Sequence, residues 1–194
     1  EGPLYETWPP ASHRKIFSET DPLQVIQSFA TRAFRRPISE GEEESLVDLY
    51  ERSFAESGDV TQSVRDVLIV ILTSPQFLFL IEESLGPESE LIDSYELASK
   101  IAFFLWNAPP DRRLLDLARR NALHESLDLE IDRMIDDPQF QRFTNAFVSQ
   151  WLSLDKLDTV EIDRKQFPDL TRDAKSQLRL EPVRFVEHLI RENL

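Results

Sequence analysis

The sequence predicts an all-α fold: an irregular multi-helix bundle of about eight helices, arranged either as one body or as two packed helical subdomains. Apolar residues recur with the helical period, and no alternating apolar–polar run typical of a strand is present. Most apolar stripes follow a helix-start signal, an Asp or Ser before a proline or three residues before a Glu. Only four glycines occur in 194 residues, which argues against β-sandwiches and glycine-rich phosphate loops.

Residues 1–20 show no helical period, and three prolines in this stretch oppose regular structure (Pro3, Pro9 and Pro10). The stretch is nevertheless too apolar for a free tail. We expect an extended segment from a preceding domain that packs on this chain or on a neighbour. Because the sequence begins at Glu1 rather than Met, we interpret it as an excised piece of a longer protein.

The first clear helix begins at Asp21, an N-cap followed by Pro22 at the first helical position. Pro37 ends it. Three arginines fall in its last turn, where cations complement the helix dipole (Arg32, Arg35 and Arg36). We interpret them as helix-end charges that anchor to carboxylates; the alternative is a small anion site.

Ser39 and Glu42 fit a capping box, which predicts a second helix that ends at Gly58. A third helix is predicted over residues 60–73. It is apolar nearly all round, because Ile69 and Val70 widen its stripe, so we expect it to be central and buried.

A short aromatic helix is predicted from Ser74-Pro75 to about residue 83. The polar residues 84–92 follow and contain a glycine and a proline, which makes them the best candidate for a domain boundary. We therefore expect one helical domain over residues 21–86 and a second over residues 87–194.

The second region opens with the strongly apolar stretch 94–111, which Asp93 caps and a proline pair ends. Its near-complete lack of a polar face predicts that other helices enclose it. Asp111 then caps the next helix, and a short helix is predicted over about 127–135.

An amphipathic helix begins at Asp137-Pro138, and its apolar stripe recurs at spacings of three and four residues (Phe140, Phe143, Phe147, Trp151 and Leu154). We expect this stripe to help enclose the helix over 94–111. An irregular acidic loop follows over residues 155–169. The last helix begins near Thr171, and Pro182 predicts a kink in it.

The chain has 22 basic and 36 acidic residues, a net charge of −14. We expect no nucleic-acid partner, because such binding draws on Lys and Arg contacts to phosphate. We expect no membrane span, because the most apolar window, 67–81, is shorter than the about 20 residues that a span needs. Cysteine is absent, which excludes thiolate metal sites and covalent c-type haem attachment here. We therefore expect no cofactor in this segment.

Weaker patterns each have a plainer explanation. His188 and Glu192 share a helix face, but a zinc site needs further ligands. The acidic loop could hold calcium, yet it lacks the glycine and the spacing of an EF-hand. Two carboxylates for glycoside hydrolysis would need a cleft. Nucleophile elbows, Walker loops, HExxH and Rossmann fingerprints are missing, so we name no catalytic residue and no metal ligand.

Five residues are the candidates for a binding or interface site: Trp106, Asp111, Gln150, Trp151 and Asp158. Each tryptophan could line a ligand pocket, although core packing is the commoner role. Such a pocket would place Trp106 near Asp111 and Gln150, with the acidic loop beside it.

Two stretches resemble known families. Residues 28–83 resemble the planctomycete domain of unknown function 1595, through RAFRRPISEGEEESLVDLY and VLIVILTSPQFLFLIE. Residues 91–194 resemble the larger part of the domain of unknown function 1592, through LIDSYELASKIAFFLWNAPPD and FVSQWLSLDKLDTVEIDRKQFPDL.

The resemblance implies a context. Such domains belong to large, exported multidomain proteins of planctomycetes and related bacteria, often with a cytochrome-c-like haem domain elsewhere in the chain. We therefore expect an exported or periplasmic scaffold whose partners are other domains of the same chain or another protein. One alternative is the substrate-pocket or docking part of an oxidoreductase whose haem lies in another domain. A second is a carbohydrate-binding or hydrolytic module.

Overall fold

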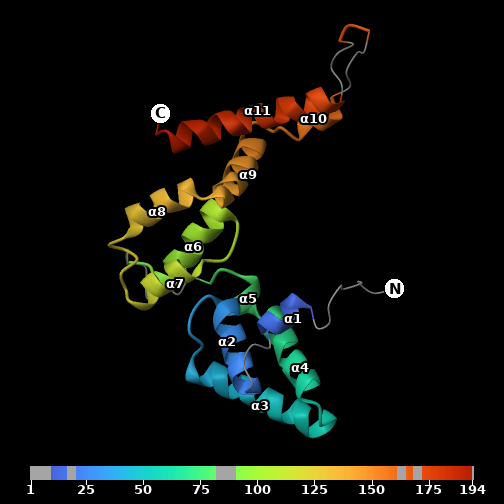
Figure 1. Cartoon of the computed structure of the whole chain (residues 1–194), viewed down its shortest axis with the longest axis vertical. Helices are drawn as coiled ribbons and strands as arrows, with labels where there is room; N and C mark the ends of the chain where they lie inside the picture. Colours follow the sequence, from blue (N-terminus) through green and yellow to red (C-terminus); the bar gives the residue numbers. More distant parts are fainter. Residues whose placement is uncertain (1–9, 17–20, 82–90, 161–164, 168–171, 194) are drawn as a thin grey trace. The chain divides into compact units, whose positions relative to one another are not determined.

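The computed structural model describes residues 10–16, 21–81, 91–160, 165–167 and 172–193 (Figure 1). Within these residues all regular structure is helical, no strand is present, and 8 helices have seven residues or more. The prediction of an all-α fold is confirmed. The chain divides into two compact units, residues 1–91 and 92–194, and each is described by itself.

Unit 1 is built on α2 (Pro22–Phe34), α3 (Glu40–Ser57) and α4 (Val60–Thr73), and α4 packs against both of the others. The short α5 (Pro75–Leu78) contacts α2 and α4. Most of the core comes from the facing stripes of α2 and α4 (Val25, Ile26, Ala30, Ala33, Phe34, Val64, Val67, Leu68 and Ile71).

The predicted helix ends in unit 1 are confirmed by their caps. Asp21 accepts a hydrogen bond from the backbone N–H of Leu23. Ser39 and Glu42 form both bonds of the capping box. Gly58 ends α3 with φ of 65°, a left-handed conformation that glycine adopts without the steric cost of a Cβ atom.

The N-terminal stretch differs from the prediction, because α1 (Ala11–Ile16) is helical rather than extended. Prolines oppose the interior of a helix but not its start, and the Pro10 carbonyl accepts from the Arg14 N–H. Ile16 packs against the core of unit 1. Residues 1–9 and 17–20 lie outside the described residues.

Two expectations for α4 and α5 were wrong. Helix α4 buries one face only, and Ile69 and Val70 are 52% and 46% exposed. In unit 1, α2 and α3 cover the face of Val64, Val67 and Ile71 and leave the opposite side open. Helix α5 ends at Leu78 instead of near residue 83, because the backbone of Phe79 is extended.

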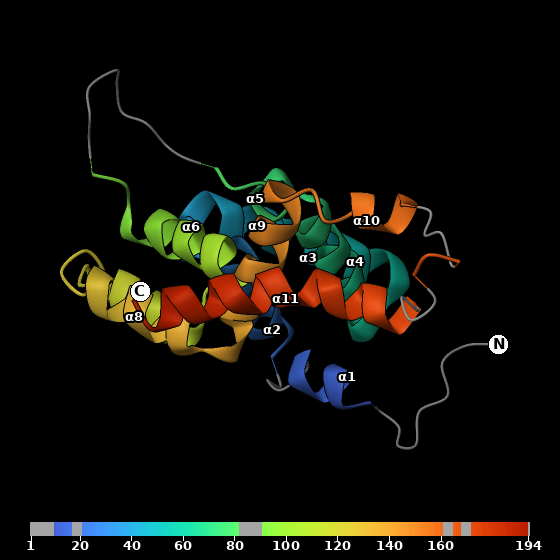
Figure 2. The same cartoon turned by 90° about the horizontal axis from the view of Figure 1, so that it is seen from above.

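Unit 2 contains α6 (Ser94–Trp106), α7 (Arg112–Arg119), α8 (Leu127–Asp136), a 3-10 turn η1 (Pro138–Phe140) and α9 (Gln141–Trp151). The short α10 (Lys156–Thr159) leads to the long α11 (Arg172–Arg191), which lies across α9 in both views (Figures 1 and 2). The main core of unit 2 gathers residues from α6, α7, α8, η1 and the turn between α7 and α8 (Ala98, Ala102, Leu105, Trp106, Leu114, Ala118, Leu123, Met134 and Phe140).

The helix starts of unit 2 follow the sequence signals. Asp93 caps α6 by accepting from the N–H groups of Tyr95 and Glu96, and Asp111 caps α7. Asn121, the predicted stop after α7, has φ of 51°. Pro182 lies inside a continuous α11.

The two most apolar helices of unit 2 are less enclosed than predicted. On α6 the side chain of Phe104 is 66% exposed. The buried face of α9 begins with Phe140 in η1 and continues through Thr144 and Val148, each four residues apart. Phe147 and Trp151 therefore fall at the edge of that face. The apolar arc of each helix is wider than the surface that its neighbours in unit 2 cover.

Candidate functional site

Trp106 lies in the core of unit 2 and is 1% exposed. Its Nε1 donates a hydrogen bond of 3.0 Å to the Met134 carbonyl, and the guanidinium of Arg133 lies 5.2 Å from its ring centroid. These contacts satisfy both the polar and the aromatic parts of the side chain. Its position is that of a packing residue.

Asp111 belongs to a charged network beside Trp106. One carboxylate oxygen accepts from the Leu114 N–H, and the other accepts from Arg133 at 2.9 Å. Arg133 also donates to Glu130 at 2.7 Å. Burial opposes the charge on Arg133, but these carboxylates outweigh it and raise the pKa of the guanidinium. Asp111 is therefore engaged in capping and ion pairing, and it joins Trp106 through Arg133.

Glu130 is the buried centre of that network, at 1% exposure. It accepts from Arg113 on one oxygen and from Arg133 on the other, each at 2.7 Å. A buried carboxylate is stable only when paired in this way. The sequence did not single out Glu130, because an acidic residue within a helix gives no signal of burial.

Gln150 and Trp151 lie on the surface of α9, where Trp151 is 64% exposed. The structure thus brings Trp106 and Asp111 together in a buried network and leaves Gln150 and Trp151 exposed to solvent. The side chain of Asp158 lies outside the described residues.

Trp151 is one end of a continuous row of aromatic rings. Phe143 stacks on Phe147 with centroids 5.4 Å apart and planes 9° apart, and Phe147 stacks on Trp151 at 5.8 Å and 27°. Phe104 on α6 contacts Phe143 at 5.1 Å. We call Phe104, Phe143, Phe147 and Trp151 the aromatic ridge. The sequence predicted the row but placed it inside.

The α9 part of the aromatic ridge lies in a stretch of the chain that is poor in charge. From Pro138 to Leu154 the one charged residue is Arg142, whereas 30% of the whole chain is charged. Exposed aromatic residues with few acidic or lysine neighbours are typical of the centre of a protein–protein interface. The α9 part of the ridge therefore has a composition typical of an interface.

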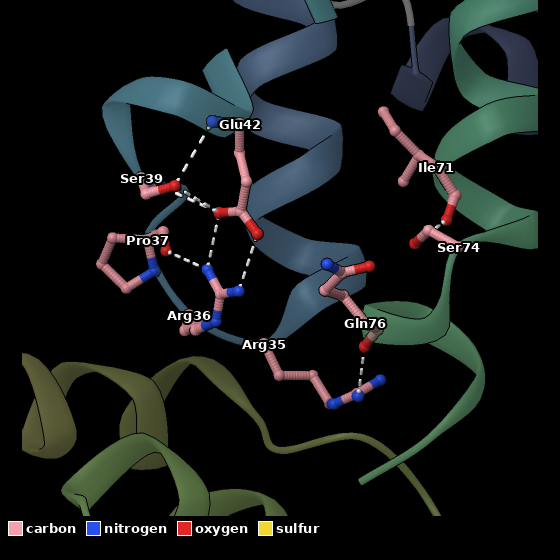
Figure 3. Close-up of polar contacts among 8 residues, drawn as sticks. All are labelled: Arg35, Arg36, Pro37, Ser39, Glu42, Ile71, Ser74 and Gln76. Atoms are coloured by element: carbon pink, nitrogen blue, oxygen red, sulfur yellow. Dashed lines mark hydrogen bonds and ion pairs between the residues drawn. The ribbon is translucent and has the colours of Figure 1, made fainter. Parts of the chain in front are cut away.

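Arg35 and Arg36, at the end of α2, have structural roles, and Figure 3 draws contacts of both. Arg36 forms two hydrogen bonds to the carboxylate of Glu42, at 2.8 and 2.9 Å. This pair, mainly through its hydrogen bonds, lowers the pKa of Glu42 to about 2. Arg36 thus anchors to a carboxylate as predicted, next to the capping bond between Glu42 and Ser39.

Arg35 behaves differently, because it is 7% exposed and donates to backbone carbonyls. Its guanidinium reaches the carbonyls of Gln76 at 2.8 Å, Phe79 at 3.0 Å and Phe77 at 3.3 Å (Figure 3 draws the first). These are carbonyls at the end of α5, which lack partners within the helix. Burial lowers the pKa of Arg35. The side chain therefore fastens α5 to the end of α2.

A serine–histidine pair also occurs in unit 2. Ser94 Oγ lies 3.4 Å from His124 Nδ1. Ser94 is 5% exposed, and His124 Nε2 is buried without a hydrogen-bond partner among the described residues. A nucleophile would need access to substrate and a base oriented by a third group. This pair instead holds the turn after α7 against the start of α6.

Two further kinds of site are absent from the described residues. No group of three or more histidine, aspartate or glutamate side chains that could hold a metal ion is found among them. None of their helices combines the length and the hydropathy needed to cross a bilayer.

The fold and the surface of the described residues define an all-α chain of two helical units with structural ion pairs and an exposed aromatic row. Residues 92–194 match the model of the family described as protein of unknown function DUF1592, and residues 23–82 match that of DUF1595. The chain belongs to the DUF1592 family and carries a DUF1595 region before it. Comparison with curated proteins and with solved structures found no match.

Proposed function

We propose that this chain is a helical interaction module of a larger exported, haem-associated protein, and that it docks through the aromatic ridge. The observation that carries the proposal is the exposure of Phe104, Phe147 and Trp151, at 66%, 45% and 64%. The last two lie in a stretch with one charged residue. Solvating such a continuous apolar row is unfavourable, and covering it is the usual source of affinity at an interface.

The charged residues of unit 2 support a structural role over a catalytic one. Asp111, Glu130 and Arg133 bind one another, and Trp106 packs beneath them. Carboxylates held in this way are engaged in the fold rather than aimed at a substrate. The larger context, export and a haem domain elsewhere, rests on the resemblance to multidomain proteins described above.

The ring geometry favours a protein partner over a sugar. A sugar stacks on the free face of an aromatic ring, whereas Phe143, Phe147 and Trp151 turn their faces toward one another with planes 9° and 27° apart. Stacked rings cover part of each other's faces, so this row has fewer free ring faces than a flat platform of the same residues. A ridge of this kind fits between the side chains of another helix.

The test compares the double variant Phe147→Ser, Trp151→Ser with the control Phe185→Ser, whose side chain is also exposed, at 60%. In the isolated 194-residue chain, at a concentration too low for the chain to associate, we expect the double variant to change the unfolding free energy by less than about 1 kcal/mol, because it alters partly exposed rings. In the complete assembled protein it should lower the unfolding temperature clearly, since docking stabilises the folded state.

Calorimetry measures the unfolding of the isolated chain and of the assembled protein, each with and without the double substitution. The control variant should behave alike in the isolated chain and in the assembly. A double variant with the same small effect in both forms would contradict the proposed function.

A further inference from the structure

Two parallel rows of side chains lie next to each other on the outer part of α9, whose other exposed residues are Gln141 and Asn145. Phe143, Phe147 and Trp151 recur every four residues and form the helical part of the aromatic ridge. Beside them runs a second exposed row at the same spacing, made of Arg142, Ala146 and Gln150. Ala146, at the centre of the second row, is small, so the helix surface is recessed there relative to the aromatic row. Arg142 turns its guanidinium to the Trp106 carbonyl, at 3.3 Å.

Rows of side chains four residues apart are the features that interlock when two helices pack, the raised row of one entering the low row of the other. A face that carries both rows is complementary to itself. After rotation about a two-fold axis, each raised row meets the low row of the other copy, as an isologous interface requires.

Charge opposes a second copy over most of the chain, but not along α9. With a net charge of −14, two copies of the chain repel each other over most of their surface. Between Asp137 and Asp155 the sequence has no acidic residue. The residues of α9 therefore bring no carboxylates of their own into a contact between two copies.

We propose that the aromatic ridge is covered by the ridge of a second copy of this chain, with α9 packed on α9 about a two-fold axis beside Ala146. This inference rests on the proposed docking function and names its partner.

Sedimentation of the purified 194-residue chain tests the proposal. From about 1 to about 200 µM the mass should rise from 22.6 kDa toward twice that value. The association should tighten between about 0.05 and 0.5 M salt, because salt screens the repulsion between two acidic chains. Salt would instead weaken the binding of a basic partner, because it screens the attraction between opposite charges.

Substitutions at Ala146 test the two-fold arrangement. Ala146→Glu and Ala146→Lys each place two like charges beside the axis, so each variant alone should associate at least about tenfold more weakly than the wild type. An equimolar mixture of the two should recover the dimer, because each interface then holds one Glu and one Lys. Ala55→Glu, at an exposed alanine of α3, is the control and should leave the wild-type association unchanged.

Three results would overturn the proposal: a monomer at every concentration and both salt conditions, a dimer that Ala146→Glu does not weaken, or a mixture that stays monomeric. Each is distinct from failure of the proposed function, which shows as an unaltered unfolding temperature of the assembled protein carrying the ridge variant.

Discussion

Arg35 illustrates how one side chain can hold two segments together. It has φ of 61°, a conformation that costs a residue with a Cβ atom about 1 kcal/mol. The side chain offsets this cost through charge-assisted hydrogen bonds to carbonyls that end α5. Pro37 predicted the end of the helix, but nothing in the sequence identified the partners of Arg35, because backbone carbonyls carry no residue-specific signal.

Two substitutions of Arg35 separate the cost of its positive φ from the stabilisation by its hydrogen bonds. Arg35→Ala should lower the unfolding free energy by about 3 kcal/mol, because the α5 carbonyls lose a buried donor. Arg35→Gly should cost about 1 kcal/mol less than Arg35→Ala, because glycine adopts positive φ freely. Urea unfolding followed by circular dichroism measures both. Equal losses in the two variants would show that the backbone conformation stores no strain.

Glu42 gives unit 1 a defined response to acid. Its pKa falls from 4.5 in the unfolded chain to about 2 in the folded one. A depressed carboxyl pKa stabilises the fold above pH 4.5, and this contribution is lost as the pH falls from 4.5 toward 2. Because Arg36 is 38% exposed, water screens the pair, and we expect about 1 kcal/mol at neutral pH.

Glu42→Gln measures that contribution. The difference in unfolding free energy between wild type and variant should be largest near pH 7 and should shrink by more than half by about pH 3. Urea titrations at several pH values provide the comparison. A difference that stays constant across this range would contradict a role for the Glu42 charge.

At the scale of the element, the sequence located helices better than it located their faces. Caps are local, so Asp21, Ser39, Gly58 and Asp93 marked helix ends correctly. Which side of a helix is covered depends on neighbours distant in the sequence. Helices α4, α6 and α9 carry apolar residues over more than one face, and for them the period could not distinguish the buried arc from the exposed one.

Two substitutions in helix α9 test which of its faces is buried. Val148 is fully buried, whereas Phe147 is 45% exposed. Val148→Ala should cost about 2 kcal/mol through lost burial and the cavity left behind, and Phe147→Ala should cost less than about 1 kcal/mol despite removing more atoms. Thermal unfolding of the two variants ranks them. The reverse order would mean that Phe147 belongs to the core.

At the scale of the whole molecule, composition and family resemblance predicted more of the structure than any single motif did. The helical fold class followed from periodicity and the scarcity of glycine. Of the five candidate site residues, Trp106 and Asp111 belong to a buried network, while Gln150 and Trp151 lie on the exposed face of α9. The sequence could not show which of the two tryptophans is buried, because tryptophan is common both in cores and at interfaces.

We expect the aromatic ridge to be covered by a partner in the complete assembled protein. Hydroxyl-radical footprinting of the complete assembled protein, compared with the isolated chain at low concentration, measures this side chain by side chain. Phe104, Phe147 and Trp151 should be oxidised several-fold more slowly in the assembly, and Phe185, exposed on α11, should react equally in both. Equal oxidation of the ridge in the two samples would contradict the claim.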